Sequence, residues 1–234
     1  MATPARLFNL MTFAPPCAYV AIYLPERFGF LTYWTLAVHA LYFLSALLLG
    51  SSRSVRILHS VSFVGAWAVL VSYSQMAVAG SLHWGSFYEW ERRIGNKFLV
   101  PYFYLHLEKA WEHLLPVIAL ELDARAGRDS LRQCYAGTHR AAQCAIGTGL
   151  YLALGVTWEQ TQQVARGTDF FANYALPPHF KSSALIGAAA AEGLPDDFVF
   201  SQGMKAIMLV GAVAAYLSRL RFCFAPEAPK DKAG

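Results

Sequence analysis

Long apolar runs, separated by short polar segments, dominate the pattern of hydrophobic and polar positions along this chain. Several of these runs reach the roughly 20 residues that an α-helix needs to cross a bilayer. We expect an all-α bundle of about six transmembrane helices over residues 1–222 and a flexible tail over 223–234. The expected spans are Leu7–Leu24, Phe28–Gly50, Leu58–Ala79, Pro101–Asp123, Arg140–Trp158 and Phe198–Leu220.

A stripe of ionisable residues interrupts the apolar pattern in the middle of the fourth expected span. Its members are His106, Glu108, Lys109, Glu112 and His113. Such groups cost about 2.5–3.5 kcal/mol each at the centre of a bilayer, so they face a partner or a cavity. His106 and His113 share one helix face, Glu108 and Glu112 lie on a neighbouring face, and Lys109 reaches Glu112 or His113. The stripe predicts either an ion-pair network between helices or a site that handles protons or a ligand.

Composition and charge agree with a membrane protein. Charged residues make up 15% of the chain, against about 25% in soluble domains. The net charge of +4 is spread over loops and tails, so it does not indicate nucleic-acid binding. Ten Lys and Arg collect on the side of both expected termini and six on the other side, which favours cytoplasmic termini. The four cysteines show no zinc-site or CxxC spacing.

The remaining candidate chemistry consists of hydroxyl and imidazole groups on helices, since no serine elbow, P-loop or HExxH motif is present. Thr32, Thr35 and His39 share one face of the second span, which we expect to be buried. Thr32 and His39 lie about 10.5 Å apart along the helix axis, too far for a nucleophile and its base. A base for Thr32 must come from another helix, and the fourth span offers His106 and His113.

The second and fourth spans run parallel, so residues at the same depth in the membrane can meet. We therefore compare the depths of His106 and His113 with that of Thr32. Thr32 lies about 6 Å into its helix, His106 about 7.5 Å and His113 about 18 Å. Straight helices favour His106 as the partner of Thr32. A protruding start or a tilt of the fourth helix favours His113.

Short motifs in these two spans resemble a known family. The FLTYW stretch at 30–34 is similar to the F-L-T-aromatic segment of the androgen-induced protein and androgen-dependent tissue-factor-pathway-inhibitor regulating protein family. Residues 101–106, PYFYLH, are similar to the family's P-x-W-x-N-H, and HLLP at 113–116 to the H-x-x-P pattern of its more distant members. Lys109 stands where vertebrate members carry a second, catalytic His.

The resemblance implies a six-span membrane hydrolase of fatty-acid esters of hydroxy fatty acids, with Thr32 as its nucleophile. The H-x-x-P pattern favours His113 as the base, and His106 stays its rival. Glu108 or Glu112 would orient the imidazole or stabilise its cation, as the third member of a triad does. Lys109 and His39 would support the site. A lipid held between the helices is the expected partner, and no cofactor or metal is expected.

Two other functions stay open. The first is a haem-binding electron carrier. Four histidines lie in or near the expected spans: His39, His106, His113 and His139. His39 and one of the two fourth-span histidines would hold a haem between facing helices. Alternatively, the chain is a non-catalytic subunit of a membrane assembly, and its charged stripe pairs with a partner chain.

Overall fold

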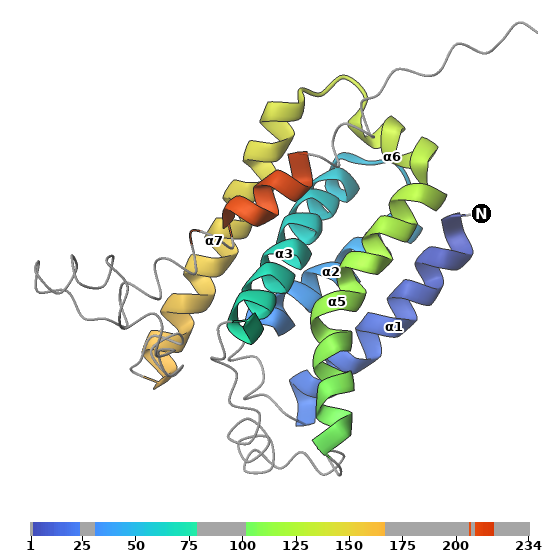
Figure 1. Cartoon of the computed structure of the whole chain (residues 1–234). Coiled ribbons are helices and arrows are strands. Elements are labelled where there is room, and N and C mark those ends of the chain that lie inside the picture. The colour runs from blue at the N-terminus through green and yellow to red at the C-terminus, as the bar shows by residue number, and fades with distance from the viewer. Residues whose placement is uncertain (1, 24–30, 79–101, 167–205, 207–208, 218–234) are drawn as a thin grey trace, which may run out of the picture.

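Every described element of this protein is an α-helix, so the all-helical fold class is confirmed for this part of the chain. The structure is a computed structural model, and it describes residues 2–23, 31–78, 102–166, 206 and 209–217. The helices are α1 (Ala2–Tyr23), α2 (Leu31–Leu48), α3 (Arg53–Val78), α5 (Tyr102–Ala126), α6 (Arg128–Tyr135), α7 (Arg140–Arg166) and a further helical segment at 209–217 (Figure 1). The polar, aromatic hairpin that the sequence predicts at 80–97, most of the connection that it predicts at 159–197 and the C-terminal tail lie outside these residues.

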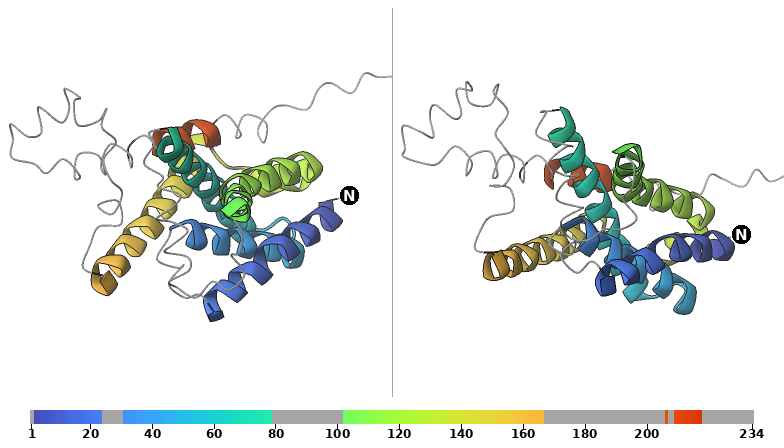
Figure 2. Two further views of the ribbon diagram at one scale, coloured as in Figure 1. Left: turned by 60° about the horizontal axis from the view of Figure 1, so that its bottom comes forward. Right: turned by 90° about the horizontal axis from the view of Figure 1, so that it is seen from below.

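α2, α5 and α7 pack around α3, and α1 lies on the other side of α2 and α5, as two further views show (Figure 2). α1 packs on α2, α2 packs on α3, and α3 also contacts α5 and α7. Contacts from Tyr33 to Glu112 and from Tyr42 to Asp123 follow the same order on α2 and α5, so these two helices run parallel, as predicted. α1 runs antiparallel to α5, because Arg6 meets Asp123 whereas the later Phe13 meets the earlier Trp111.

Two glycines allow α3 and α7 to approach closely. A Cβ on Gly65 of α3 would lie 2.8 Å from the Tyr151 ring of α7 and 2.9 Å from the Thr35 methyl of α2. A Cβ on Gly147 of α7 would lie 2.8 Å from Cβ of Ser60. Small residues at such crossings are typical of helix packing in membranes.

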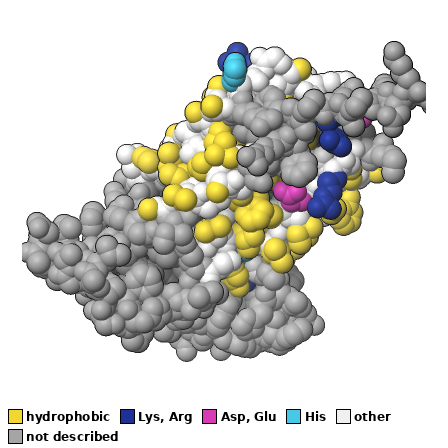
Figure 3. Space-filling model, turned by 45° about the horizontal axis from the view of Figure 1, so that its top comes forward, with side chains coloured by type: hydrophobic (Ala, Val, Ile, Leu, Met, Phe, Trp, Pro, Cys, Tyr) yellow, Lys and Arg dark blue, Asp and Glu magenta, His cyan; other side chains and the backbone are white. Residues whose placement is uncertain are grey.

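Besides a hydrophobic core that includes Phe13, Phe43 and Phe63, the bundle buries ionisable residues and exposes large apolar ones. Ionisable residues such as Lys109, Glu112 and Asp123 are buried. Large apolar side chains are exposed on α1, α2, α5 and α7, and one face of the molecule shows such apolar surface (Figure 3). Exposed apolar patches of this kind mark contact with another apolar phase or partner.

Two described helices are long and apolar enough to cross a membrane: Leu31–Leu48, and Arg53–Ser74 within α3. They correspond to the second and third spans expected from the sequence. Length and composition alone qualify these two helices as candidate membrane spans.

Two local expectations were wrong. α7 continues to Arg166, beyond the expected end at Trp158, because the polar residues after Trp158 extend the helix without interruption. The sequence pattern also predicts a basic loop with Arg125, Arg128 and Arg132 after the fourth span; instead α5 runs to Ala126 and most of the remainder forms α6. α6 is amphipathic: it buries an apolar side that includes Leu131 and exposes Arg128 and Asp129.

Candidate active site

Thr32 and His113 meet across the interface of α2 and α5. The Thr32 Oγ1 lies 3.5 Å from His113 Nε2. Thr32 sits half-buried in the first described turn of α2, and His113 lies buried in the middle of α5. The predicted contact between the second and fourth spans is therefore confirmed. The separation is at the long end of hydrogen-bond reach, as often found for catalytic pairs before substrate binds.

The second ring nitrogen of His113 fixes the tautomer. Its Nδ1 lies 2.7 Å from the carbonyl oxygen of Lys109, one turn earlier on α5. A carbonyl only accepts hydrogen bonds, so Nδ1 must carry the proton and donate it. The Nε2 lone pair is then directed at Thr32, whose hydroxyl donates to it. This is the arrangement that a general base requires.

The Tyr73 ring of α3 covers one face of the His113 imidazole. The ring centroids are 4.1 Å apart and the planes differ by 24°, which is a stacked arrangement. Together with the Nδ1 bond, this contact holds the imidazole from a second helix. Tyr73 was not predicted, because a tyrosine in an apolar span gives no sequence signal that separates it from a packing residue.

The Glu112 carboxylate has partners other than the imidazole. It accepts hydrogen bonds from Lys109 Nζ, at 2.7 Å from Oε2, and from the Tyr33 hydroxyl. The expectation that Glu112 orients His113 directly is wrong, because the Lys109 carbonyl occupies the Nδ1 proton. The Lys109 carbonyl orients the His113 imidazole in place of a carboxylate, because it lies one helical turn before the ring. Lys109 pairs with Glu112, one of its two expected partners.

The other predicted site residues lie apart from this contact or are not described. His39 is fully buried on α2, with its Nδ1 2.5 Å from the Ser62 hydroxyl and its ring edge-on to Phe13 and Phe43. It acts as a packed core histidine rather than as part of the Thr32 contact. The side chains of His106 and Glu108 lie outside the described residues, although their backbone belongs to α5.

Three of the four histidines named for a haem carrier have described side chains, and the side chain of His106 lies outside the described residues. Both nitrogens of His113 face protein atoms, and the His39 ring is enclosed by aromatic side chains. His139 is exposed, beyond the end of α6. Within the described residues, no group of three or more His, Cys, Asp or Glu side chains is placed to hold a metal ion.

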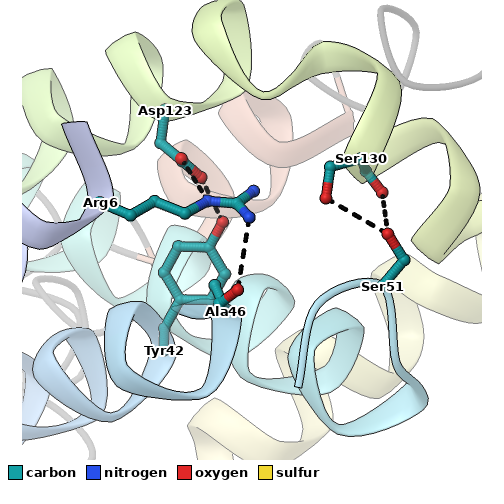
Figure 4. A network of polar contacts seen from close by, with 6 residues as sticks. All are labelled: Arg6, Tyr42, Ala46, Ser51, Asp123 and Ser130. Carbon is teal, nitrogen blue, oxygen red and sulfur yellow. Dashed lines mark hydrogen bonds and ion pairs between the residues drawn. The ribbon is translucent and has the colours of Figure 1, made fainter. Parts of the chain in front are cut away.

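A second buried ion pair ties α1, α2 and α5 together near the opposite end of α2 (Figure 4). Arg6 Nε lies 2.8 Å from Asp123 Oδ1, and the Tyr42 hydroxyl donates to Asp123 Oδ2. Arg6 Nη1 also lies 3.5 Å from the carbonyl oxygen of Ala46. Arg6, Tyr42 and Asp123 each contact a residue of another helix, so we assign the cluster to the packing of the bundle.

A third polar cluster contains a serine and an imidazole, but it is sealed from solvent. Ser60 contacts the hydroxyls of Tyr135, at 3.0 Å, and Tyr216, and the Tyr135 hydroxyl lies 2.8 Å from His59 Nδ1. Ser60 has no accessible surface. A molecule from outside the bundle has no access to Ser60, whereas the Thr32 side chain is only half-buried.

No family model, curated protein or solved structure matches the chain. The assignment of a function therefore rests on the geometry of the site and on the resemblance of its two short motifs.

Proposed function

We propose that this protein is an integral-membrane ester hydrolase in which Thr32 is the nucleophile and His113 the general base. The observation that carries the proposal is the contact of the Thr32 hydroxyl with Nε2 of an imidazole whose Nδ1 proton is already bound to the Lys109 carbonyl. A hydroxyl becomes a nucleophile when a base within reach removes its proton, and this tautomer supplies that base.

The reaction follows from the position of the two groups. Thr32 Oγ1 attacks the ester carbonyl while its proton moves to His113 Nε2. The ester C–O bond then breaks, the imidazolium returns the proton to the leaving alkoxide, and an acyl-threonine remains. Water then attacks the acyl group, giving a proton to Nε2, and the freed Thr32 oxygen recovers that proton as the carboxylic acid leaves.

We extend the membrane assignment to six spans over the whole chain. α2 and α3 are long and apolar enough to cross a membrane. The exposed apolar side chains of α1, α5 and α7 support a membrane environment for those helices too. The ion pairs Arg6–Asp123 and Lys109–Glu112 pair four buried charges of α1 and α5 with one another. The expected sixth span includes the helical segment at 209–217.

The substrate class follows from the resemblance together with the surroundings. The family that the motifs resemble hydrolyses fatty-acid esters of hydroxy fatty acids. A site set among apolar helices with few polar groups suits long acyl chains. We therefore take an ester between two lipid chains as the substrate.

The test compares two threonines on one helix, with activity measured on a fatty-acid ester of a hydroxy fatty acid and labelling measured with a fluorophosphonate probe. Thr32→Ala abolishes both, while Thr32→Ser keeps part of the activity because the hydroxyl remains. Thr35→Ala is the control, since the Thr35 hydroxyl is bonded to the Leu31 carbonyl at 3.0 Å. Full activity of Thr32→Ala would show the proposal to be wrong. A purified wild-type protein without labelling or hydrolysis would favour the non-catalytic subunit instead.

A further inference from the structure

Two neighbouring contacts join α2 and α5 at the candidate site. Thr32 meets His113, and the next residue on α2, Tyr33, meets the preceding residue on α5, Glu112. The first contact joins the groups that react in the proposed mechanism. The second joins groups that have no chemical step in it, so its role must be sought in the geometry.

The Tyr33–Glu112 contact lies in the interior of the bundle. Tyr33 is 3% exposed and Glu112 is 2% exposed. The Glu112 carboxylate takes one hydrogen bond from Tyr33 on α2 and another from Lys109 on its own helix. A buried carboxylate with both oxygens bonded in this way has little freedom to move, because breaking either bond would leave a buried polar group unsatisfied.

The same cluster also holds the base. Lys109 binds Glu112 through its ammonium group and binds the His113 Nδ1 proton through its backbone carbonyl. The Tyr33 hydroxyl therefore connects the backbone next to the nucleophile with the helical turn that orients the imidazole.

We propose that Tyr33 is a positioning residue, whose hydroxyl holds α2 and α5 in the register that brings Thr32 onto His113. This inference rests on the proposed hydrolase function. The Thr32–His113 separation of 3.5 Å is already at the edge of hydrogen-bond reach. A small relative slide of the two helices would break the contact, and a misplacement of about 1 Å costs on the order of a hundredfold in rate.

The chain contains a matched control on the same two helices. Tyr42 of α2 donates to Asp123 of α5, and Asp123 is also paired with a cation, Arg6. Tyr33 and Tyr42 are both buried and each donates to an ion-paired carboxylate. Tyr33 is next to Thr32 on α2, whereas Tyr42 lies about 15 Å from Thr32 along the helix. Loss of the Tyr42 hydroxyl should therefore leave the Thr32–His113 contact in place.

The experiment measures Tm, kcat, KM and the rate of fluorophosphonate labelling for Tyr33→Phe and Tyr42→Phe. Each variant loses one hydroxyl, so we expect comparable falls in Tm. Tyr33→Phe lowers kcat and the labelling rate by at least about tenfold with KM within about twofold, because alignment and not binding is lost. Tyr42→Phe keeps kcat within about twofold of wild type. Equal kcat in the two variants would overturn the inference.

A second variant covers the case in which Tyr33→Phe does not fold. Glu112→Asp keeps the negative charge beside Lys109 but withdraws the carboxylate from the Tyr33 hydroxyl by one methylene. It should lower kcat while leaving KM close to the wild-type value; an unchanged kcat counts against a positioning role. Thr32→Ala separates the two proposals. If Thr32→Ala is inactive while Tyr33→Phe behaves like Tyr42→Phe, the hydrolase function stands and this inference fails.

Discussion

The Tyr73 ring lies against the imidazole of His113, with centroids 4.1 Å apart and planes within 24° of parallel. In the proposed reaction His113 becomes an imidazolium when it accepts the Thr32 proton. The face of an aromatic ring attracts a cation by about 0.5–2 kcal/mol, so Tyr73 stabilises that charged intermediate as well as the ring orientation.

Replacement of Tyr73 tests this contact. Tyr73→Phe keeps the ring and retains activity within about threefold, whereas Tyr73→Leu lowers kcat by about tenfold, the equivalent of about 1.4 kcal/mol. Phe63→Leu, on the same helix, is the control, because Phe63 packs against Tyr216 and does not contact His113. Steady-state kinetics in detergent give the comparison. Wild-type kcat in Tyr73→Leu would assign the ring to packing alone.

The base assignment is tested by substituting each fourth-span histidine. His113→Ala loses as much activity as Thr32→Ala, and the double variant loses no more, because residues that act as a unit are not additive. His106→Ala retains activity. Should His106→Ala be inactive and His113→Ala active, the base role moves to His106 while the threonine mechanism stands.

Glu112→Gln is expected to damage stability. Removing one partner of a buried ion pair leaves the other charge without compensation, at a cost of about 3–5 kcal/mol. Glu112 is buried and bonded to both Lys109 and Tyr33, so its loss has no compensation from water. Thermal unfolding compares it with Glu121→Gln, a half-buried glutamate of the same helix. An unchanged Tm for Glu112→Gln means that the charge is solvated.

Substitution of two glycines of α7 by alanine is expected to have different effects on stability. Gly147→Ala places a Cβ 2.8 Å from Ser60 Cβ and 3.2 Å from its backbone, and overpacking of this kind costs about 1–3 kcal/mol. Gly149→Ala meets nothing within 4 Å, so the gain in helix propensity leaves stability unchanged or raises it by about 1 kcal/mol. Measured melting temperatures of the two variants test this difference in stability. Equal values would mean that α3 and α7 are not in close contact at Ser60.

The sequence predicted the helical fold class and the meeting of Thr32 with a fourth-span histidine. Hydropathy and helical periodicity carry this information, because they define which residues share a buried face. The depth comparison for straight helices favoured His106, but His113 meets Thr32. His113 lies about 16 Å along α5 from its first residue, at 1.5 Å per residue, whereas Thr32 lies in the first described turn of α2. The beginning of α5 therefore projects beyond the beginning of α2.

The partners that fix the site could not be predicted in the same way. Tyr33 and Tyr73 contact α5 from two other helices, and their contacts depend on the relative depth and rotation of those helices. Periodicity within one helix does not define these quantities. The choice of the Lys109 carbonyl over the Glu112 carboxylate as the acceptor for His113 likewise depends on side-chain directions that residue spacing leaves open.

The two ion pairs have a consequence for the biogenesis of the protein. Lys109 and Glu112 lie on one helix, three positions apart, so their charges cancel within a single segment as the ribosome delivers it. Asp123 instead pairs with Arg6 of α1, which is synthesised first. In the proposed membrane topology, the Arg6 cation is synthesised before the last turn of α5, so a partner for the Asp123 carboxylate is present when that turn is inserted.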